Sequence, residues 1–342
     1  MASHRRPKQP TRARVTVLTS VAAAAVALTA QSASAAPAKP SKDEVKSQVD
    51  ALYEEAEQAT EKFNGAKERQ ATLEKEIGQI QDQVARGQSE LNELRSVLGS
   101  MASAQYRTGG IDPSLALLLS EDPDSYLDKA SSLEHLSGKQ VEAVQKIQAK
   151  QRTLAQQRQE AAGKLADLDA TRKELAEKKK VSSEKLAAAQ AILNTLTAQE
   201  RAALKDEETR ASRADSQRVD LGDVKASGRA GAALAAAKTK VGSAYISGHE
   251  GPSSFDCSGL TQWAYKQAGV NISRVTYTQA NDGTRISRSQ LQPGDLVFFY
   301  GDLHHVGLYA GNNMTLHASN PRGGVKYESM DNMPFQFGVR IG

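Results

Sequence analysis

The stretch Phe255-Asp256-Cys257-Ser258-Gly259-Leu260 contains the only cysteine of the 342-residue chain. A lone cysteine has no partner for a disulfide within the chain, so it is either an inert buried residue or a reactive free thiol. Apolar residues recur at helical spacing after it and Gly269 stops the pattern, which predicts a helix over 257–268. Asp256 is then the N-cap. Cys257 lies in the first turn, where free N–H groups and the helix dipole are expected to lower the thiol pKa, which favours a reactive thiol.

Aromatic residues are concentrated in the C-terminal part of the chain. Of 16 Phe, Trp and Tyr residues, 12 follow residue 240, so only that part has the large side chains for a compact mixed core. The long middle is rich in Ala, Gln, Glu, Lys and Leu, a composition typical of coiled coils. The first 35 residues hold five basic residues and no acid, and the rest holds 39 basic and 40 acidic residues. The net charge of +4 therefore does not indicate nucleic-acid binding.

Residues 1–35 have the pattern of a secretory signal peptide. Five basic residues precede an apolar run over 15–30, and Ala33-Ser34-Ala35 is a small-residue cleavage site. The alternative is a membrane anchor, but the run is shorter than the roughly 20 residues that a spanning helix needs. We therefore expect cleavage before Ala36 and a secreted, cell-wall location for the remainder.

Two long periodic runs predict a helical arm. Apolar positions step by three and four residues over 45–101, through eight heptads, which is the pattern of a coiled coil. A second run over 144–196 has polar residues at several core positions. We expect an arm over 36–204, broken at 108–126, that folds back on itself as an antiparallel hairpin. Helices that pair between two molecules would give the same pattern.

The break and the end of the arm have their own compositions. The apolar patch 111–119 lies at the expected tip of the hairpin. It is either a cap that closes the coil or a docking site for a partner, since exposed apolar patches often mark interfaces. Residues 205–228 are polar and contain Gly222 and Gly228, so a linker is predicted there.

The pattern changes at residue 229 to that of a compact domain. A helix is expected over 230–241, ahead of the cysteine helix, and strands alternate with turn residues beyond it. The expected strands cover 295–300, 305–309, 314–317, 325–329 and 337–341. Helices first and strands later predict an α+β fold with an antiparallel sheet over 229–342.

Histidines of this domain are candidates for a base beside the thiol: His249, His304, His305 and His317. If the hairpin turn comprises three residues, 311–313, then His305 and His317 are diagonal neighbours on one face of the sheet, about 7–8 Å apart. A two-residue turn would put them on opposite faces. A single histidine in a sheet is usually structural. Two on one face, with the cysteine helix packed there, would supply a nucleophile, a base and a residue that orients the base.

A metal site is the rival interpretation of one cysteine and several histidines. The spacing from Cys257 to His305 matches no compact ligand motif, and zinc sites usually contain at least one closely spaced ligand pair. We therefore expect no metal site.

Four motifs resemble those of the NlpC-type cell-wall peptidases, papain-like cysteine hydrolases of bacterial peptidoglycan. In chain order they are FDCSGLTQWAY at 255–265, LQPGDLVFF at 291–299, HVGLY at 305–309 and LHA at 316–318. The resemblance covers nearly all of residues 232–342. It implies that Cys257 is the nucleophile, His305 the general base and His317 the polar third member. His304 is expected at the rim of the site.

The resemblance also implies residues that bind the substrate. Tyr245 would line the site and help to hold the oxyanion, and Asp256 and Ser258 would help to recognise the free amine end of the stem peptide. Asp256 can do this and cap the helix. The family usually has Tyr-x-Trp-Gly-Gly where this chain reads Tyr245-Ile246-Ser247-Gly248-His249. We expect that departure to affect substrate preference more than chemistry.

The implied activity is hydrolysis of a peptide bond in the peptidoglycan stem, typically between D-glutamate and a diamino acid. Cys257 would attack the carbonyl, His305 would protonate the leaving amine, and water would release the acyl-enzyme. This mechanism implies that no metal or organic cofactor is needed. A coiled-coil arm ahead of such a domain resembles secreted hydrolases of daughter-cell separation, in which the arm binds a membrane or wall partner or covers the groove. We expect stem peptides as substrate and a regulatory arm. An adaptor that activates other wall hydrolases and an acyltransferase are the alternative functions.

Overall fold

The computed structural model describes residues 41–107, 115, 126–218 and 228–342. The predicted signal peptide lies outside these residues, as does the tip patch 111–119 apart from Leu115. Among the residues described, no helix combines the length and the apolar character needed to cross a bilayer. Residues 41–342 form one unit, in which the arm and the C-terminal domain are in contact.

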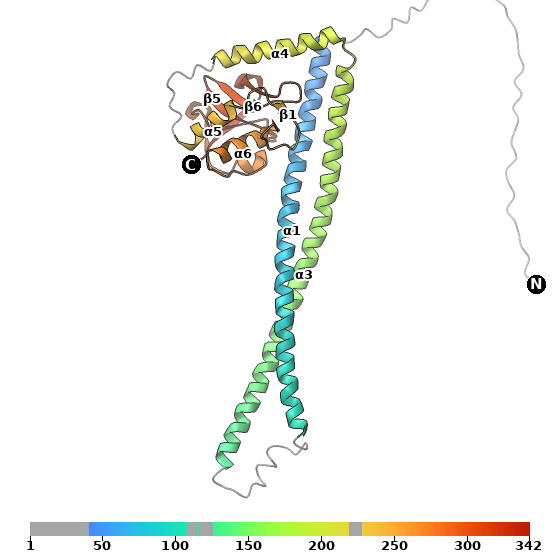
Figure 1. The fold of residues 1–342 in the computed structure, drawn as a ribbon, viewed down its shortest axis with the longest axis vertical. Helices are drawn as coiled ribbons and strands as arrows, with labels where there is room; N and C mark the ends of the chain where they lie inside the picture. Colours follow the sequence, from blue (N-terminus) through green and yellow to red (C-terminus); the bar gives the residue numbers. More distant parts are fainter. Residues whose placement is uncertain (1–40, 108–114, 116–125, 219–227) are drawn as a thin grey trace, which may run out of the picture. The chain divides into compact units, whose positions relative to one another are not determined.

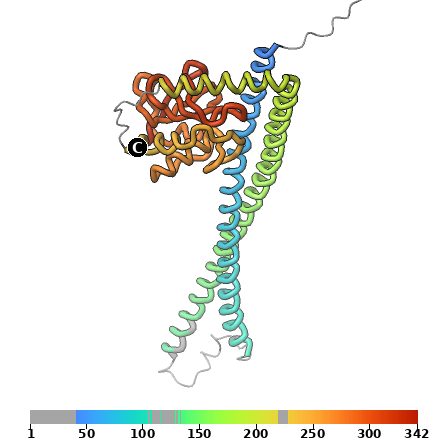
Figure 2. The backbone as a smooth tube through the Cα atoms, turned by 45° about the horizontal axis from the view of Figure 1, so that its top comes forward, coloured from blue at the N-terminus to red at the C-terminus, as the bar shows by residue number. Residues whose placement is uncertain are grey.

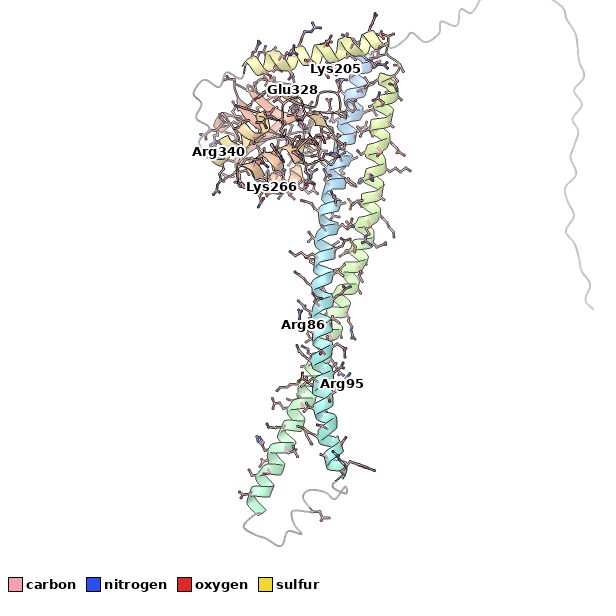
Figure 3. The ribbon with its side chains drawn as sticks, in the orientation of Figure 1. Arg86, Arg95, Lys205, Lys266, Glu328 and Arg340 are labelled. Atoms are coloured by element: carbon pink, nitrogen blue, oxygen red, sulfur yellow. The ribbon has the colours of Figure 1, made fainter. Side chains whose placement is uncertain are left out.

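Two long helices make up the arm, α1 (Lys42–Arg107) and α3 (Tyr126–Leu193). They lie side by side in both views of the backbone (Figure 1, Figure 2), so the predicted hairpin is confirmed. Apolar residues from both helices are buried along the seam, as in the cluster of Leu73, Ile77 and Leu168. Charged side chains cover the outside of the pair (Figure 3), where ion pairs such as Lys164–Glu76 at 2.8 Å join the helices. Exposed pairs of this kind stabilise little, so burial of the seam holds the arm together.

The segment predicted as a linker is mostly helical. Helix α4 runs from Ala198 to Arg218, so the expectation of a linker is wrong for residues 205–218, and residues 219–227 lie outside the described part. A capping box starts α4, because Thr197 Oγ1 accepts a hydrogen bond from the Glu200 N–H at 3.2 Å and Glu200 accepts one from the Thr197 N–H at 2.7 Å. Leu204 is buried between α4 and the arm.

The C-terminal domain is the predicted α+β domain with an antiparallel sheet. Its helices are α5 (Arg229–Lys238), α6 (Cys257–Gln267) and α7 (Thr276–Gln279), with 3₁₀ turns at Arg288–Gln290 and Met330–Asn332. The sheet order is β3-β8-β4-β5-β6-β7. Its strands are β3 (Thr284–Ile286), β4 (Leu296–Phe299), β5 (His305–Gly311), β6 (Met314–Ala318), β7 (Val325–Ser329) and β8 (Phe335–Arg340). Strand β3 was not expected. A separate parallel pair joins β1 (Ala244–Tyr245) to β2 (Ser254–Phe255).

Helix α6 packs against β5 and β6 and brings the cysteine to them. Its buried residues Leu260, Ala264 and Tyr265 belong to the main core, together with apolar side chains of the central strands. The hydroxyl of Tyr265 donates a hydrogen bond to the Gly294 carbonyl at 2.8 Å, so burial of this ring leaves no unpaired hydroxyl. The position of the N-terminal end of α6 is therefore fixed by the core.

The turn between β5 and β6 differs from the prediction, although the register does not. Asn312 and Asn313 form a two-residue turn with φ values of 50° and 62°, a conformation that asparagine tolerates better than most residues. The pairing shifts by one residue between Tyr309 and Gly311. This bulge supplies the extra residue that a three-residue turn would have supplied, so Leu308 still pairs with Leu316 as predicted. The two histidines therefore share one face of the sheet.

Candidate active site

Cys257 is the first residue of α6, and its side chain is fully buried. Asp256 is the N-cap, as predicted. Its backbone is extended, and its Oδ1 accepts a hydrogen bond from the Gly259 N–H at 2.7 Å. The helix start therefore places the thiol at the point where α6 meets β5.

His305 and His317 are in direct contact on the face of the sheet that meets this helix. His305 Nε2 lies 2.6 Å from His317 Nδ1, and the ring planes are nearly perpendicular at 87°. A nitrogen of His305 also lies within 4.8 Å of Cys257 Sγ. The structure thus brings together the three residues expected to carry the chemistry.

Glu328 extends this chain of polar groups. Its Oε2 lies 3.1 Å from His317 Nε2 and 2.9 Å from the ammonium of Lys326. Strand β7 pairs with β6 so that Lys326 is opposite His317 and Glu328 is diagonal to it. A neutral His317 can then accept from His305 at Nδ1 and donate to the carboxylate at Nε2. The sequence analysis did not select Glu328. The strand 325–329 was predicted, but nothing in the sequence showed that this strand pairs with the strand of His317.

Asp256 and Ser258 form a buried polar network with a residue that sequence analysis did not select. The Arg274 guanidinium donates to Asp256 Oδ2 at 2.6 Å and to Ser258 Oγ at 2.7 Å. The same arginine pairs with Glu250 at 2.9 Å. A charge-paired carboxylate and an oriented hydroxyl therefore flank the thiol.

Three other predicted residues lie around this centre. Tyr245 is buried in the core beside Cys257. His249 lies in the loop ahead of the cysteine, with Nδ1 2.8 Å from Ser254 Oγ. His304 is 3% exposed and stacks on Tyr300 at 4.2 Å between ring centroids, so the expectation that it is a rim residue is wrong. Its position just before β5 points its ring into the structure rather than to solvent.

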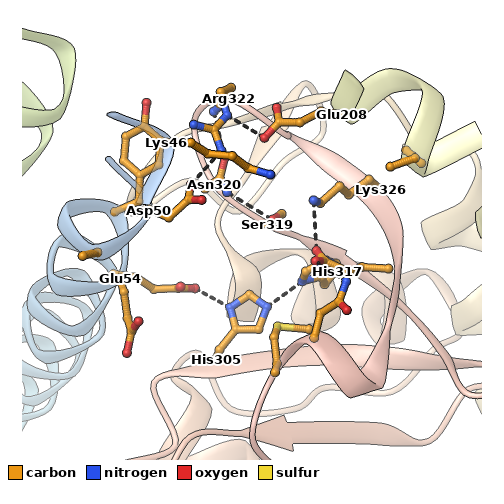
Figure 4. A pocket seen from close by; sticks show the side chains of 18 of the residues that line it. Lys46, Asp50, Glu54, Glu208, His305, His317, Ser319, Asn320, Arg322 and Lys326 are labelled. Carbon is orange, nitrogen blue, oxygen red and sulfur yellow. Dashed lines mark hydrogen bonds and ion pairs between the residues drawn. The ribbon is translucent and has the colours of Figure 1, made fainter. Parts of the chain in front are cut away.

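Helix α1 of the arm contacts this centre. The sequence analysis considered that the arm could cover the groove but named no residues of the arm that would do so. Glu57 Oε1 lies 2.6 Å from His305 Nδ1, and both side chains are buried. In Figure 4, His305 lies between α1 and His317, and dashed lines mark its two hydrogen bonds. The nitrogen that faces the arm is therefore already occupied by a carboxylate.

The next turns of α1 contact the cysteine helix and α7. Glu61 accepts hydrogen bonds from Ser258 Oγ at 2.6 Å and from the Thr276 N–H at 2.9 Å, and its Oε1 lies 3.8 Å from Cys257 Sγ. Asn64 Nδ2 donates to Asp256 Oδ2 at 3.1 Å. Glu57, Glu61 and Asn64 follow the four- and three-residue steps of one helix face. This polar stripe covers the thiol, the base and the predicted amine-binding residues together.

Two further contacts hold α1 in this position. Gly65 lies against Tyr277, and a Cβ atom at residue 65 would be 1.7 Å from the tyrosine hydroxyl oxygen, so a larger residue requires α1 or the tyrosine ring to move. Arg322 donates to Asp50 of α1 at 2.6 Å and to Glu208 of α4 at 2.5 Å. Figure 4 shows this arginine between the two carboxylates, at the edge of a cavity of about 710 Å³ that His305, His317 and Glu57 also line.

Burial by the arm changes the protonation of the site. The pKa of the Cys257 thiol is well above its usual value because the side chain is fully buried and because Glu57, Glu61 and Asp256 surround it. This reverses the prediction of a lowered pKa, since desolvation and carboxylates outweigh the helix dipole. Burial also raises the pKa of Glu61 to about 7, and the charge of Asp256 adds to the effect.

The two histidines have pKa values that move in opposite directions. Burial alone would lower the pKa of His305, but the charge and hydrogen bond of Glu57 outweigh burial, so the pKa is raised. Burial lowers the pKa of His317 to about 4, although its hydrogen bond to Glu328 opposes the shift. Burial and the neighbouring charges thus favour a neutral Cys257 thiol and a neutral His317, and Glu57 favours the protonated form of His305.

The sequence that contains these residues matches a known protein family. Residues 242–339 match the model of the NlpC/P60 family. The C-terminal domain is an NlpC/P60 domain. The chain is 48% identical to a probable endopeptidase of Corynebacterium glutamicum over 106 residues, which are 31% of this chain and 51% of the relative. It is 44% identical to the probable endopeptidase p60 of Listeria monocytogenes over 99 residues, 28% of this chain and 20% of the relative.

Solved NlpC/P60 domains are also similar. The NlpC/p60 domain of the peptidoglycan hydrolase SagA is 36% identical, with a TM-score of 0.32, over 33% of this chain and 98% of that chain. The chain spans about half or less of the length of these curated relatives.

Proposed function

We propose that this chain is a cysteine endopeptidase of peptidoglycan stem peptides, held inactive by α1 in the state described. The proposal is carried by one observation, the contact of His305 with His317 beside a buried free thiol inside an NlpC/P60 domain. Relatives named endopeptidases and a similar structure named a peptidoglycan hydrolase support it. An adaptor role is less favoured because Cys257, His305 and His317 are all present.

The active state requires His305 Nδ1 to be free of Glu57. It would then take the proton of the Cys257 thiol, and the thiolate would attack the carbonyl of the scissile bond. His305 would return that proton to the leaving amine, and water would hydrolyse the thioester. His317 and Glu328 would hold the imidazole in the required tautomer. Tyr245 and the first N–H groups of α6 would stabilise the oxyanion.

The arm prevents each of these steps. Glu57 holds the nitrogen that must receive the thiol proton, Glu61 occupies Ser258 and Thr276, and Asn64 occupies Asp256. We propose that the stem peptide takes the place of Glu61 and Asn64 when α1 withdraws. We also propose that the bond cleaved joins D-glutamate to a diamino acid, that residues 1–35 direct export to the wall, and that a membrane or wall protein acts on the arm.

The test compares the full chain with a variant that displaces the arm. Gly65→Leu should push α1 away from Tyr277 without weakening the helix, since leucine is a better helix former than glycine. Gly78→Leu is the matched control, because an added Cβ on the same helix meets no other atom within 4 Å there. Each protein is incubated with purified peptidoglycan, and the released fragments are identified by mass.

Gly65→Leu should release fragments at least 10-fold faster than the unchanged chain, and Gly78→Leu should match the unchanged chain. Adding Cys257→Ala to Gly65→Leu should abolish release. Digestion by that double variant would disprove the assigned nucleophile. Equal rates for the unchanged chain and Gly65→Leu, with both folded, would remove restraint by the arm. Products carrying an added amine would indicate acyl transfer instead of hydrolysis.

A further inference from the structure

Three different metal-binding groups meet where α1 contacts the NlpC/P60 domain. They are the Glu57 carboxylate, the Cys257 thiol and a ring nitrogen of His305, all buried, with ligand atoms within 4.8 Å of one another. Within the described residues this is the one group of three such ligands. Glu57 is separated from Cys257 by 200 residues of sequence and from His305 by 248. Ligand spacing in the sequence therefore could not reveal the group.

The distances between the three ligand atoms are close to those around a tetrahedral ion. Zinc binds sulfur at about 2.3 Å, imidazole nitrogen at about 2.0–2.1 Å and carboxylate oxygen at about 2.0–2.2 Å, so its ligand atoms lie roughly 3.3–3.7 Å apart. The closest pair here, Glu57 Oε1 and His305 Nδ1, is 2.6 Å apart, and the widest separation is within 4.8 Å. Shifts of about 1 Å in the side chains would open the space for an ion. A water molecule from the adjoining cavity, which Glu57 and His305 line, would supply the fourth ligand.

Groups around the ligands already have the arrangement found at metal sites. The second nitrogen of a metal-bound histidine is normally held by a carboxylate, a carbonyl or another polar partner. His305 Nε2 is held by His317, and His317 is held by Glu328. A thiolate, an imidazole and a carboxylate together favour zinc over calcium or magnesium, which prefer oxygen ligands.

We propose that Zn²⁺ binds to Glu57, Cys257 and His305 and locks α1 onto the closed active site. Binding displaces the thiol proton of Cys257 and the proton on His305 Nδ1, and the ion then bridges the three ligands in place of these hydrogens. The nucleophile and the base are both occupied. Because Glu57 is available to the ion only while α1 is docked, the metal favours the docked arm, and the docked arm favours the metal.

The experiment is a cobalt titration of the full chain under reducing conditions without oxygen. Co²⁺ takes zinc sites and gives a thiolate-to-cobalt absorption band in the near ultraviolet that reports a Co–S bond directly. Zn²⁺ is then added in competition. The unchanged chain should give the band with one equivalent of metal. Cys257→Ser, which keeps the size of the side chain, should give none.

The ligand from the arm is tested by Glu57→Gln, with Glu54→Gln on the same helix as the matched control. Loss of a residue that only hydrogen-bonds to a metal ligand weakens metal affinity by about 10–100-fold. Glu57 is a direct ligand in this proposal, so its loss should weaken cobalt affinity at least about 10-fold. Glu54→Gln should leave affinity unchanged. Thermal unfolding of each variant establishes that it is folded. A Glu57→Gln variant that binds cobalt as tightly as the unchanged chain, or a band that survives Cys257→Ser, would overturn the zinc site.

This inference rests on the proposed closed state of the arm, but its measurement needs no hydrolysis. Gly65→Leu should weaken cobalt binding as Glu57→Gln does, because it moves the carboxylate away from the thiol. If Gly65→Leu releases wall fragments while metal affinity is the same in all variants, the peptidase proposal stands and the zinc proposal falls. If cobalt binds as expected and no variant cleaves peptidoglycan, the zinc proposal stands and the peptidase proposal falls.

Discussion

Glu57 Oε1 lies 2.6 Å from His305 Nδ1, although 248 residues separate the two in the chain. The contact joins the arm to the residue that would activate the thiol. Both side chains are buried, so their charges are little screened by solvent. A carboxylate in this position stabilises an imidazolium, which cannot accept a proton. One contact therefore accounts for the raised pKa of His305 and for the inactive state that we propose.

The thiol should be slow to react while the arm is docked. The pKa of Cys257 is raised by burial and by three nearby carboxylates, so the thiolate fraction is low. We expect iodoacetamide to alkylate Cys257 in the unchanged chain at least 10-fold more slowly than in Gly65→Leu. Intact-protein mass over time measures the rate, because the chain has no other cysteine. Gly78→Leu should react like the unchanged chain, and equal rates for all three would contradict a docked arm.

The arm contact should weaken as pH rises. Glu61 has a pKa raised from 4.5 to about 7, so it stabilises the docked state below about pH 4.5 and loses that contribution as pH passes 7, a difference of about 3 kcal/mol. His305 acts in the same direction, because its pKa is also raised and its pairing with Glu57 is lost above that pKa. We expect alkylation of Cys257 to accelerate between about pH 5 and pH 9 by more than thiol ionisation alone explains.

Glu61→Gln isolates the contribution of this carboxyl group to the pH dependence. The groups facing it include the Cys257 thiol and polar or charged side chains: Ser258, Thr276, Asn64, Asp256 and Arg274. An uncharged amide avoids the cost of ionisation, so the Tm of this variant should fall less over about pH 5 to 9 than the Tm of the unchanged chain. Glu93→Gln, on an exposed part of α1, is the control and should follow the unchanged chain. Parallel curves for Glu61→Gln and the control would show that Glu61 does not titrate as described.

Glu328 should position His317 without touching substrate. Its carboxylate lies 3.1 Å from His317 Nε2, and Glu328→Gln can present an amide N–H there, which favours the wrong tautomer of the ring. In the Gly65→Leu background we expect a loss of about 10-fold in kcat with little change in KM, which is smaller than the roughly 100-fold or larger effect of a general acid or base because Glu328 acts through His317. A purely structural role would instead lower Tm and leave kcat of the folded enzyme intact. Lys326→Met, which removes the neighbouring charge but keeps Glu328, should have the smaller effect.

Arg322 should hold α1 and α4 to the domain at once. It pairs with Asp50 and Glu208, and its removal leaves the largely buried Glu208 carboxylate without a cation. We expect Arg322→Ala to cost about 1–3 kcal/mol of stability, since the site is only partly buried, and to speed alkylation of Cys257. Lys266→Ala, at an exposed position on α6, is the control for both measurements. Unchanged alkylation in a folded Arg322→Ala protein would show that the pair does not restrain the arm.

Local patterns predicted the elements that carry the chemistry. The cap at Asp256, the helix of Cys257 and the shared face of His305 and His317 all follow from short-range spacing. The predicted register between β5 and β6 is correct although the predicted three-residue turn is not, because the bulge before Gly311 replaces the expected third turn residue. Helix α4 was missed because glycines at 222 and 228 suggested a linker, while the capping box at Thr197 indicated a helix.

The contact between arm and site could not be predicted in the same way. Glu57, Glu61 and Asn64 have the composition of a solvated helix face, and only their partners distinguish them from the exposed charges along the rest of α1. The expected acidic thiol was wrong for the same reason, since the helix end at Asp256 is visible in the sequence and the surrounding carboxylates are not. Interactions across about 200 residues depend on how the arm docks, which periodicity does not encode.

The three blocking side chains of α1 belong to one continuous helix, and this has a mechanical consequence. A helix advances 1.5 Å and turns 100° with each residue, so rotation or sliding of the rod moves Glu57, Glu61 and Asn64 together. His305, Cys257 and Asp256, the proposed base, nucleophile and amine-binding residue, would then be uncovered in a single movement. A force applied to the far end of α1 would then switch the proposed activity on or off as a unit.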